Sequence, residues 1–229
     1  MTKELEIFPR KPPADFVYNP PQDPLVVMHK DERLIVLSKP SGLLSVPGRK
    51  EEHFDSLESR VQAEYPEART VHRLDMCTSG LVIMALDAET HRNLGLQFER
   101  RKTEKEYIAR VWGNVSDDIG EVDLPLICDW PNRPLQMVDH EQGRPAQTKW
   151  KVLEREGDVT RVMLYPITGR THQLRVHMAE IDHPILGDDF YAHKEAFQAE
   201  KRLQLHAYRL MVFHPDGGDK MWFESPCPF

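Results

Sequence analysis

The carboxylate of Asp75 lies in a segment of mixed chemistry, HRLDMCTSG at 72–80. Arg73 comes two residues earlier, on the same side of the chain if the segment is extended, and the Thr78-Ser79-Gly80 turn permits a ligand to approach the backbone closely. Because Asp75 has no acidic neighbour in this segment, we expect it to stay ionised. That suits a nucleophile better than a proton donor. The commoner role of such an Asp is a turn cap or a surface ion pair.

A second group of polar residues runs from Gly169 to His177. A helix is predicted over 171–181, starting at Gly169 and Thr171, and its first amides would favour an anion. Arg175 lies one turn inside this helix and could reach inward to pair with a carboxylate, although an arginine on a helix is usually solvated. No second acid accompanies Asp75 or the Arg175 region in the sequence.

The spacing of metal-ligating residues argues against a metal or a cofactor. His172 and His177 are five residues apart, which does not stack them on one helix face. The three cysteines, at 77, 128 and 227, form no CxxC pair, so neither a disulfide framework nor a zinc knuckle is expected. Phosphate-binding loops and a nucleophile-elbow serine are also missing from the sequence. We therefore predict no metal and no cofactor.

The charge distribution leaves an anionic substrate open. The 229 residues carry a net charge of −7, which by itself disfavours nucleic acid. Four cations nevertheless form a basic strip, Arg100, Arg101, Lys102 and Lys105, and a local field matters more than the total charge. The apolar runs are too short to span a bilayer and the first residues do not resemble a signal peptide, so a cytoplasmic protein that does not bind membranes is expected.

Apolar periodicity predicts an α+β fold with a mixed, mainly antiparallel sheet and packed helices. Residues 1–24 are rich in proline and are predicted to be extended, and 25–229 would form one domain. Helices are expected after a cap at Asp55, from a cap at Asp87 to about Arg101, and over 171–181. Strands are expected at 25–29, 34–37, 81–86, 107–113, 146–154, 159–165, 203–213 and 221–223.

These motifs resemble those of the RluA-type pseudouridine synthases. The matching segments follow the order of that family: KPSG at 39–42, HRLD with TSG at 72–80, KEYIA at 105–109 and the segment 169–177. The segment DLPLICDWPNRP at 123–134 adds to the likeness. Many members of the wider family carry an amino-terminal S4-type RNA-binding domain; here the motifs begin near Lys39, so no S4 domain is expected.

The resemblance implies that uridines in structured RNA are isomerised to pseudouridine without metal or cofactor. It implies substrates of two kinds, a hairpin loop of 23S-type rRNA and the anticodon stem-loop of some tRNAs, and no obligate protein partner. Asp75 would be the catalytic carboxylate, Arg175 would pair with it, and Tyr107 would stack on the uracil. Substrate-binding residues would be Arg73, which fills the gap left by the flipped nucleotide, Leu174 as the opposing apolar face, His72 and Arg170.

Two other functions stay open from the residues themselves. One is a carboxylate-dependent nucleoside or glycoside hydrolase, although such enzymes generally use two carboxylates. The other is a non-catalytic RNA-binding module that uses the same arginine and tyrosine surface. The sequence does not decide which uridines are modified, whether Asp75 acts as a nucleophile or through a glycal, or what the oligomeric state is.

Overall fold

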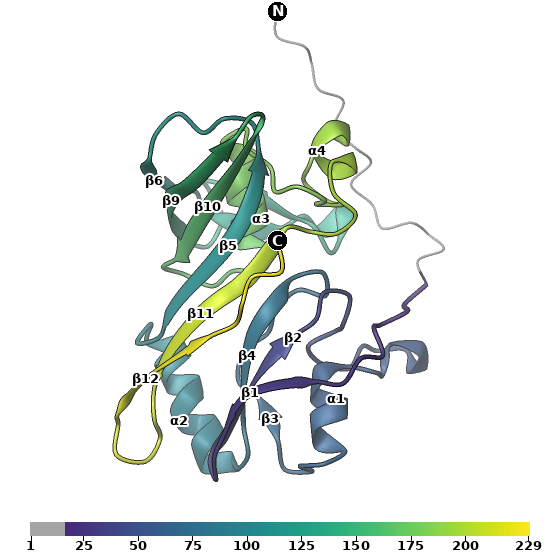
Figure 1. Ribbon diagram of the computed structural model, residues 1–229, viewed down its shortest axis with the longest axis vertical. Coiled ribbons are helices and arrows are strands. Elements are labelled where there is room, and N and C mark those ends of the chain that lie inside the picture. Colours follow the sequence, from purple (N-terminus) through teal and green to yellow (C-terminus); the bar gives the residue numbers. More distant parts are fainter. Residues whose placement is uncertain (1–16) are drawn as a thin grey trace, which may run out of the picture. The chain divides into compact units, whose positions relative to one another are not determined.

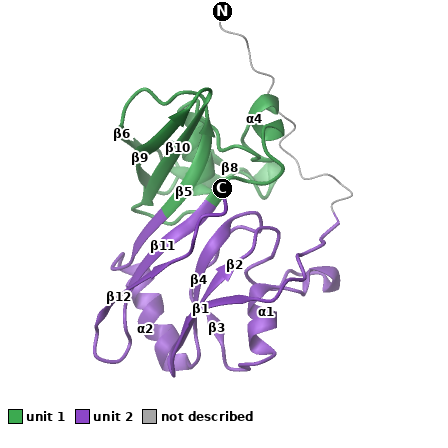
Figure 2. Ribbon diagram, viewed as in Figure 1, with its two compact units in different colours: residues 1–16, 107–205 green, residues 17–106, 206–229 purple. Residues whose placement is uncertain are grey.

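The computed structural model describes residues 17–229 (Figure 1). The described chain forms two compact units: unit 1 comprises residues 107–205, and unit 2 comprises residues 17–106 and 206–229 (Figure 2). Of the extended segment predicted at 1–24, residues 1–16 lie outside the described residues. The remainder is irregular and is held on unit 2, where the Tyr18 hydroxyl donates to the carbonyl of Asp55 at 2.9 Å. In the described part of the chain, no helix is both long enough and apolar enough to cross a membrane.

Unit 2 is a sheet with two α-helices and one short 3₁₀ helix. Its strand order is β1-β2-β4-β11, with β3 paired to β4 and β12 paired to β11. Strands β4 and β11 pair in parallel, whereas β1 with β2, β2 with β4, β3 with β4 and β11 with β12 pair antiparallel. Its elements are β1 (Val26–Lys30), β2 (Leu34–Lys39), η1 (Glu51–His53), α1 (Leu57–Gln62), β3 (Arg69–Thr70), β4 (Ser79–Ala85), α2 (Ala88–Glu99), β11 (Leu205–Phe213) and β12 (Lys220–Glu224).

Strand β4 runs through the core of unit 2 and follows directly from the Asp75 segment. All seven of its residues are buried, and Leu81 and Ile83 pack in one cluster with Leu94 of α2. Gly80 has φ +112°, and a Cβ atom there would lie 2.3 Å from the carbonyl oxygen of Ala207. The glycine predicted to let a ligand approach therefore lets β11 approach β4 instead.

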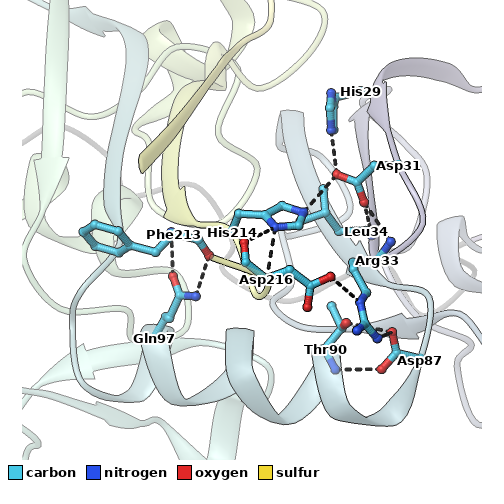
Figure 3. Close-up of polar contacts among 10 residues, drawn as sticks. All are labelled: His29, Asp31, Arg33, Leu34, Asp87, Thr90, Gln97, Phe213, His214 and Asp216. Carbon is cyan, nitrogen blue, oxygen red and sulfur yellow. Dashed lines mark hydrogen bonds and ion pairs between the residues drawn. The ribbon is translucent and has the colours of Figure 1, made fainter. Parts of the chain in front are cut away.

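One side chain caps helix α2 and another ties it to β11 (Figure 3). Asp87 caps the helix by accepting from the Thr90 amide at 2.8 Å, as predicted. Near the other end, the Gln97 amide donates to the Phe213 carbonyl at 2.7 Å and accepts from the Phe213 N–H at 2.8 Å. Because Gln97 fixes the end of α2 to β11, the first residues of the basic strip, which follow α2, have a fixed position on unit 2.

Unit 1 contains an antiparallel sheet of order β5-β10-β9-β6 and a separate two-stranded sheet, β7-β8. Val176 of helix α3 packs with Leu126, Leu135 and Tyr191 in one buried cluster. The elements are β5 (Glu104–Trp112), β6 (Ile119–Asp123), β7 (Leu126–Cys128), η2 (Trp130–Asn132), β8 (Gln136–Val138), β9 (Gln147–Glu156), β10 (Val159–Pro166), α3 (Gln173–Glu180) and α4 (Lys194–Gln198).

The predicted fold class is confirmed, but strands β3, β6, β7 and β8 were not predicted, and two helix starts differ from the prediction. The cap of α1 is Ser56, which accepts from the Ser59 amide in a reciprocal capping box; Asp55 instead forms an ion pair with Arg60 at 2.6 Å. The predicted start of the third helix at Gly169 and Thr171 was also wrong. The cap is His172 in the left-handed region at φ 54°, without a side-chain hydrogen bond to the helix.

Candidate active site

The Asp75 segment is held by a buried lysine. Lys39, at the end of β2, has no exposed surface, and its ammonium donates to the carbonyl oxygens of Pro40 at 3.0 Å, Leu43 at 2.7 Å and Met76 at 3.0 Å. A buried ammonium is costly unless its donors are satisfied. Lys39 therefore joins the loop after β2 to the residue that follows Asp75.

Further hydrogen bonds from the same loop hold the chain on both sides of Asp75. The Gly42 amide donates to the Met76 carbonyl at 2.9 Å, and the Ser41 hydroxyl donates to the Cys77 carbonyl at 2.7 Å. On the other side, the Ser45 hydroxyl donates to the Leu74 carbonyl at 2.7 Å and accepts from the Leu74 amide at 3.1 Å. The half-buried Asp75 is thus carried by a segment whose backbone is fixed before and after it.

His72 anchors the start of this segment and is a structural residue in this geometry. Its Nε2 accepts from the Ile83 amide of β4 at 3.1 Å, and its ring stacks on Phe98 of α2 with centroids 4.6 Å apart. Burial, and then the charge of Lys105, lower the pKa of His72 to about 3. The imidazole is therefore neutral at physiological pH, with its proton on Nδ1.

Arg73 differs from His72 because it is exposed. It forms no ion pair with any residue of the described range 17–229. A long cation that no carboxylate holds can follow a phosphate or enter a stacked RNA without breaking an internal contact.

The basic strip divides into two environments. Three of its members are exposed and follow the carboxyl end of α2: Arg100, Arg101 and Lys102. The helix dipole stabilises positive charges at that end. Arg101 has φ 55°, a conformation that usually selects glycine. Lys105 is half-buried in β5, and burial followed by the charge of Arg101 lowers its pKa to about 8.

In unit 1, Arg175 is buried in helix α3, so the solvated-helix interpretation does not hold. Its side chain is 3% exposed and makes paired hydrogen bonds to Asp188, from Nε at 2.8 Å and from Nη2 at 2.6 Å. Asp189 accepts from Nη2 at 2.9 Å. Although burial alone would raise the pKa of Asp188, the charge and hydrogen bonds of Arg175 lower it below its usual value.

These contacts correct one expectation, since two acids do accompany the Arg175 region. Asp188 is fully engaged, because besides Arg175 it accepts from the Phe190 amide at 2.9 Å and the Tyr191 amide at 3.1 Å. The Arg175 guanidinium also lies over the Phe190 ring, 4.8 Å from its centroid. A carboxylate used this completely orients the arginine and is poorly suited to activate water.

The residues before α3 form a second fixed loop. The His172 Nδ1 lies 2.6 Å from the Tyr191 hydroxyl. The Gln173 side chain accepts from the Arg170 amide at 3.0 Å and donates to the carbonyl of Gln147 at 2.9 Å. The Arg170 guanidinium remains half-exposed and donates to the Pro145 carbonyl at 3.1 Å.

The predicted stacking residues also belong to unit 1. Tyr107 is half-buried on β5, opposite Leu164 of β10, and Leu174 is buried on α3. Asp75, Arg73 and His72 belong to unit 2. The pairing of Asp75 with Arg175 stays a prediction.

His177 is explained by packing. Its Nε2 donates to the Leu124 carbonyl at 3.0 Å and its Nδ1 lies 2.9 Å from the Thr148 hydroxyl, and burial lowers its pKa. Among residues 17–229, no group of three His, Cys, Asp or Glu side chains is arranged to hold a metal ion.

Comparison with known proteins identifies the class. The family model described as RNA pseudouridylate synthase matches residues 33–180. The chain is 56% identical over 214 residues to the dual-specificity RNA pseudouridine synthase RluA of Salmonella typhi, covering 93% of this chain and 98% of that protein. It is 54% identical over 206 residues to the protein of the same name from Yersinia pestis, covering 90% of this chain and all of that protein.

A solved structure of a protein named for the same activity has a similar fold. Human RNA pseudouridylate synthase domain containing 1 superposes with a TM-score of 0.75 at 27% identity, covering 93% of this chain and 86% of that chain. The chain belongs to the RNA pseudouridylate synthase family and is an isomerase that acts on RNA. The resemblance inferred from the motifs is therefore confirmed.

Proposed function

We propose that this protein converts uridine to pseudouridine at two kinds of site, a hairpin loop of large-subunit rRNA and the anticodon stem-loop of some tRNAs. The proposal is supported by 56% identity, along nearly the whole chain, to enzymes named for dual specificity. The observation that supports the chemistry is that hydrogen bonds from Lys39 and Ser45 fix the backbone on both sides of Asp75. Residues 25–229 would form the catalytic domain, acting in the cytoplasm without an obligate protein partner.

The reaction rearranges one nucleotide without adding or removing atoms. The N1–C1′ bond of uridine breaks and a C5–C1′ bond forms; C5 loses a proton and N1 gains one. Asp75 is the carboxylate that assists this exchange, and its fixed backbone keeps the oxygen atoms placed while the base rotates. The glycosidic bond of a stacked nucleotide is hard to reach, so the uridine must first leave the stack.

The remaining residues have supporting roles in this proposal. Arg73, which no described carboxylate holds, fills the space left by the flipped nucleotide. Tyr107 stacks on the uracil, with Leu174 as the opposing face. Arg175 pairs with Asp75. A guanidinium has five N–H donors and can bind more than one carboxylate at a time, as the bonds of Arg175 to Asp188 and Asp189 illustrate.

The test is Asp75→Asn, assayed on an rRNA hairpin and on a tRNA anticodon stem-loop with a reagent that stops reverse transcription at pseudouridine. We expect both products to be lost while RNA binding and the unfolding transition stay as in the wild type. The control is Asp117→Asn, because Asp117 is an exposed carboxylate of unit 1. Substantial turnover by Asp75→Asn would overturn the role of Asp75.

The same assay separates the two other functions. Free uracil released from RNA by the wild-type protein would support a hydrolase. RNA that binds tightly and shows no altered uridine would support a non-catalytic binding module. Product on only one of the two RNAs would reject the dual specificity and keep the isomerase.

A further inference from the structure

Trp130 exposes a large aromatic surface that the proposed reaction does not use. It lies in η2, within the segment 123–134, and is 66% exposed. The guanidinium carbon of Arg133 lies over its ring, 4.6 Å from the centroid. A single exposed apolar residue is ordinary on a protein surface. An indole that already carries a stacked cation combines an aromatic face with a positive charge.

The turn that presents Trp130 is fixed by hydrogen bonds and by a buried anchor. The Asp129 amide donates to the Leu135 carbonyl at 2.9 Å, and the Asn132 side chain donates to the Asp129 carboxylate at 2.8 Å. Leu135 is buried in the cluster that also contains Val176 of α3. The indole is therefore held outward by a folded turn, and its exposure is not that of a loose loop.

The same turn is connected to the loop that precedes Arg175. The Gln136 amide donates to the Tyr191 hydroxyl at 2.9 Å, and that hydroxyl lies 2.6 Å from Nδ1 of His172. Within unit 1, the position of Trp130 is thus coupled through two hydrogen bonds to the start of α3.

Three arginines in this part of unit 1 are not neutralised. Among the described residues, no carboxylate forms an ion pair with Arg133, Arg144 or Arg170. The Arg144 backbone is paired with Leu126 of β7 in both directions, at 2.9 and 3.0 Å, and Arg170 donates to Pro145 at 3.1 Å. Because no described carboxylate pairs with them, the positive charges of these three arginines remain available to phosphates.

We propose that Trp130 and Arg133 form a stacking platform for an unpaired base of the substrate RNA, other than the reacting uridine, and that Arg144 and Arg170 contact the adjoining phosphates. This rests on the proposed function and adds a recognition site to it. The face of the indole opposite Arg133 can stack any base, and the guanidinium over the other face attracts the RNA backbone. A platform of this kind selects loops with a base turned outward and gives little affinity for a closed duplex.

The test compares Trp130→Ala and Trp130→Phe with Trp222→Ala. Trp222 is a matched control, since it is 46% exposed on β12 of unit 2 and has the Lys220 ammonium 5.4 Å from its ring centroid. With an anticodon stem-loop RNA, we expect Trp130→Ala to raise the Kd about 5- to 150-fold, the range that corresponds to the loss of one stacked base. Trp130→Phe should stay within about threefold of the wild type, and Trp222→Ala should bind as the wild type does.

Salt titration tests the arginines. Arg144→Ala should reduce the slope of log K against log salt by about one unit, as expected for one lost phosphate contact. An unchanged slope would remove Arg144 from the proposal.

Three outcomes would overturn the platform. The first is wild-type RNA affinity in Trp130→Ala, and the second is an equal loss of RNA affinity in Trp222→Ala. The third is a change in sedimentation of Trp130→Ala without a change in Kd, which would identify a contact between copies of the chain. Failure of the platform is distinguishable from failure of the proposed function. In the first case the wild type forms pseudouridine and the Trp130 variants bind normally; in the second the wild type forms none.

Discussion

The ammonium of Lys39 donates a hydrogen bond to the carbonyl oxygen of Met76 at 3.0 Å, one residue beyond Asp75. Lys39 has no exposed surface, and its other carbonyl partners, Pro40 and Leu43, come from the loop that follows β2. This one side chain therefore closes the loop after β2 and fixes the segment that carries the proposed catalytic carboxylate. Its role is that of a positioning residue.

Lys39→Met keeps the length of the side chain and removes its donors. The carbonyls of Leu43 and Met76 would lose a charged partner, and we expect unfolding to become easier by about 1–3 kcal/mol. Because the substitution loosens the Asp75 segment, kcat should fall more than KM rises. Denaturant unfolding and initial rates on an RNA hairpin check this.

Lys50→Met is the control, since the Lys50 side chain is 72% exposed. Wild-type stability and kcat in Lys39→Met would show that the hydrogen bonds to Lys39 do not position Asp75.

Because Arg175 and Asp188 form a buried pair, we expect the effects of their substitutions on the free energy of unfolding to be strongly coupled. Arg175→Met leaves the Asp188 carboxylate, whose side chain has no exposed surface, without its partner. We expect a loss of about 3–5 kcal/mol in the free energy of unfolding. Asp188→Asn should destabilise the protein too, and the double variant should lose less than the sum of the two. Additive losses in urea unfolding would contradict the coupling.

The prediction from sequence succeeded where the signal was local. The apolar run after Gly80 and the cap at Asp87 are contiguous in the chain, and both β4 and α2 were predicted. The role of Lys39 had no local signal, because Met76 lies 37 residues away. Asp188 and Asp189 were missed for the same reason: they follow Arg175 by 13 and 14 residues and meet it only after the chain turns back.

The neutral His72 predicts a specific loss of stability in acid. Its folded pKa of about 3 lies below the ordinary value of 6.5, so between these values the unfolded chain binds a proton that the folded protein does not. The stabilisation is complete above pH 6.5 and is lost as the pH falls toward 3, at no more than about 1.4 kcal/mol per pH unit. His72→Gln should flatten this dependence, as measured by urea unfolding from pH 7 to 4. Parallel curves for the two proteins would mean that His72 titrates equally in both states.

Because the pKa of Lys105 is lowered, we expect the protein to take up a proton when it binds RNA. With a pKa of about 8, only about a quarter of the free protein keeps this charge at pH 8.5. RNA phosphates favour the charged form, so binding at pH 8.5 should draw a proton from the buffer. Calorimetry in two buffers of different ionisation enthalpy measures the uptake.

Lys105→Arg should abolish the uptake, because an arginine stays charged. Lys102→Arg, at an exposed position of the same strip, is the control and should leave it unchanged. An uptake that persists in Lys105→Arg would assign the proton to another group.

Substitutions of Tyr107 can distinguish stacking of its ring on the uracil from packing of the ring within the sheet. The residue is half-buried on β5, opposite Leu164, so its ring area can serve either role. Tyr107→Phe keeps the ring and should retain most of the activity, whereas Tyr107→Ala should lose about 1–3 kcal/mol of RNA interaction, seen as a fall in kcat/KM of about 5- to 150-fold. Urea unfolding of both variants corrects for lost packing, because a purely structural ring would lower stability and activity together. If Phe and Ala gave the same kcat/KM, Tyr107 would be a packing residue of the sheet and another side chain would have to hold the uracil.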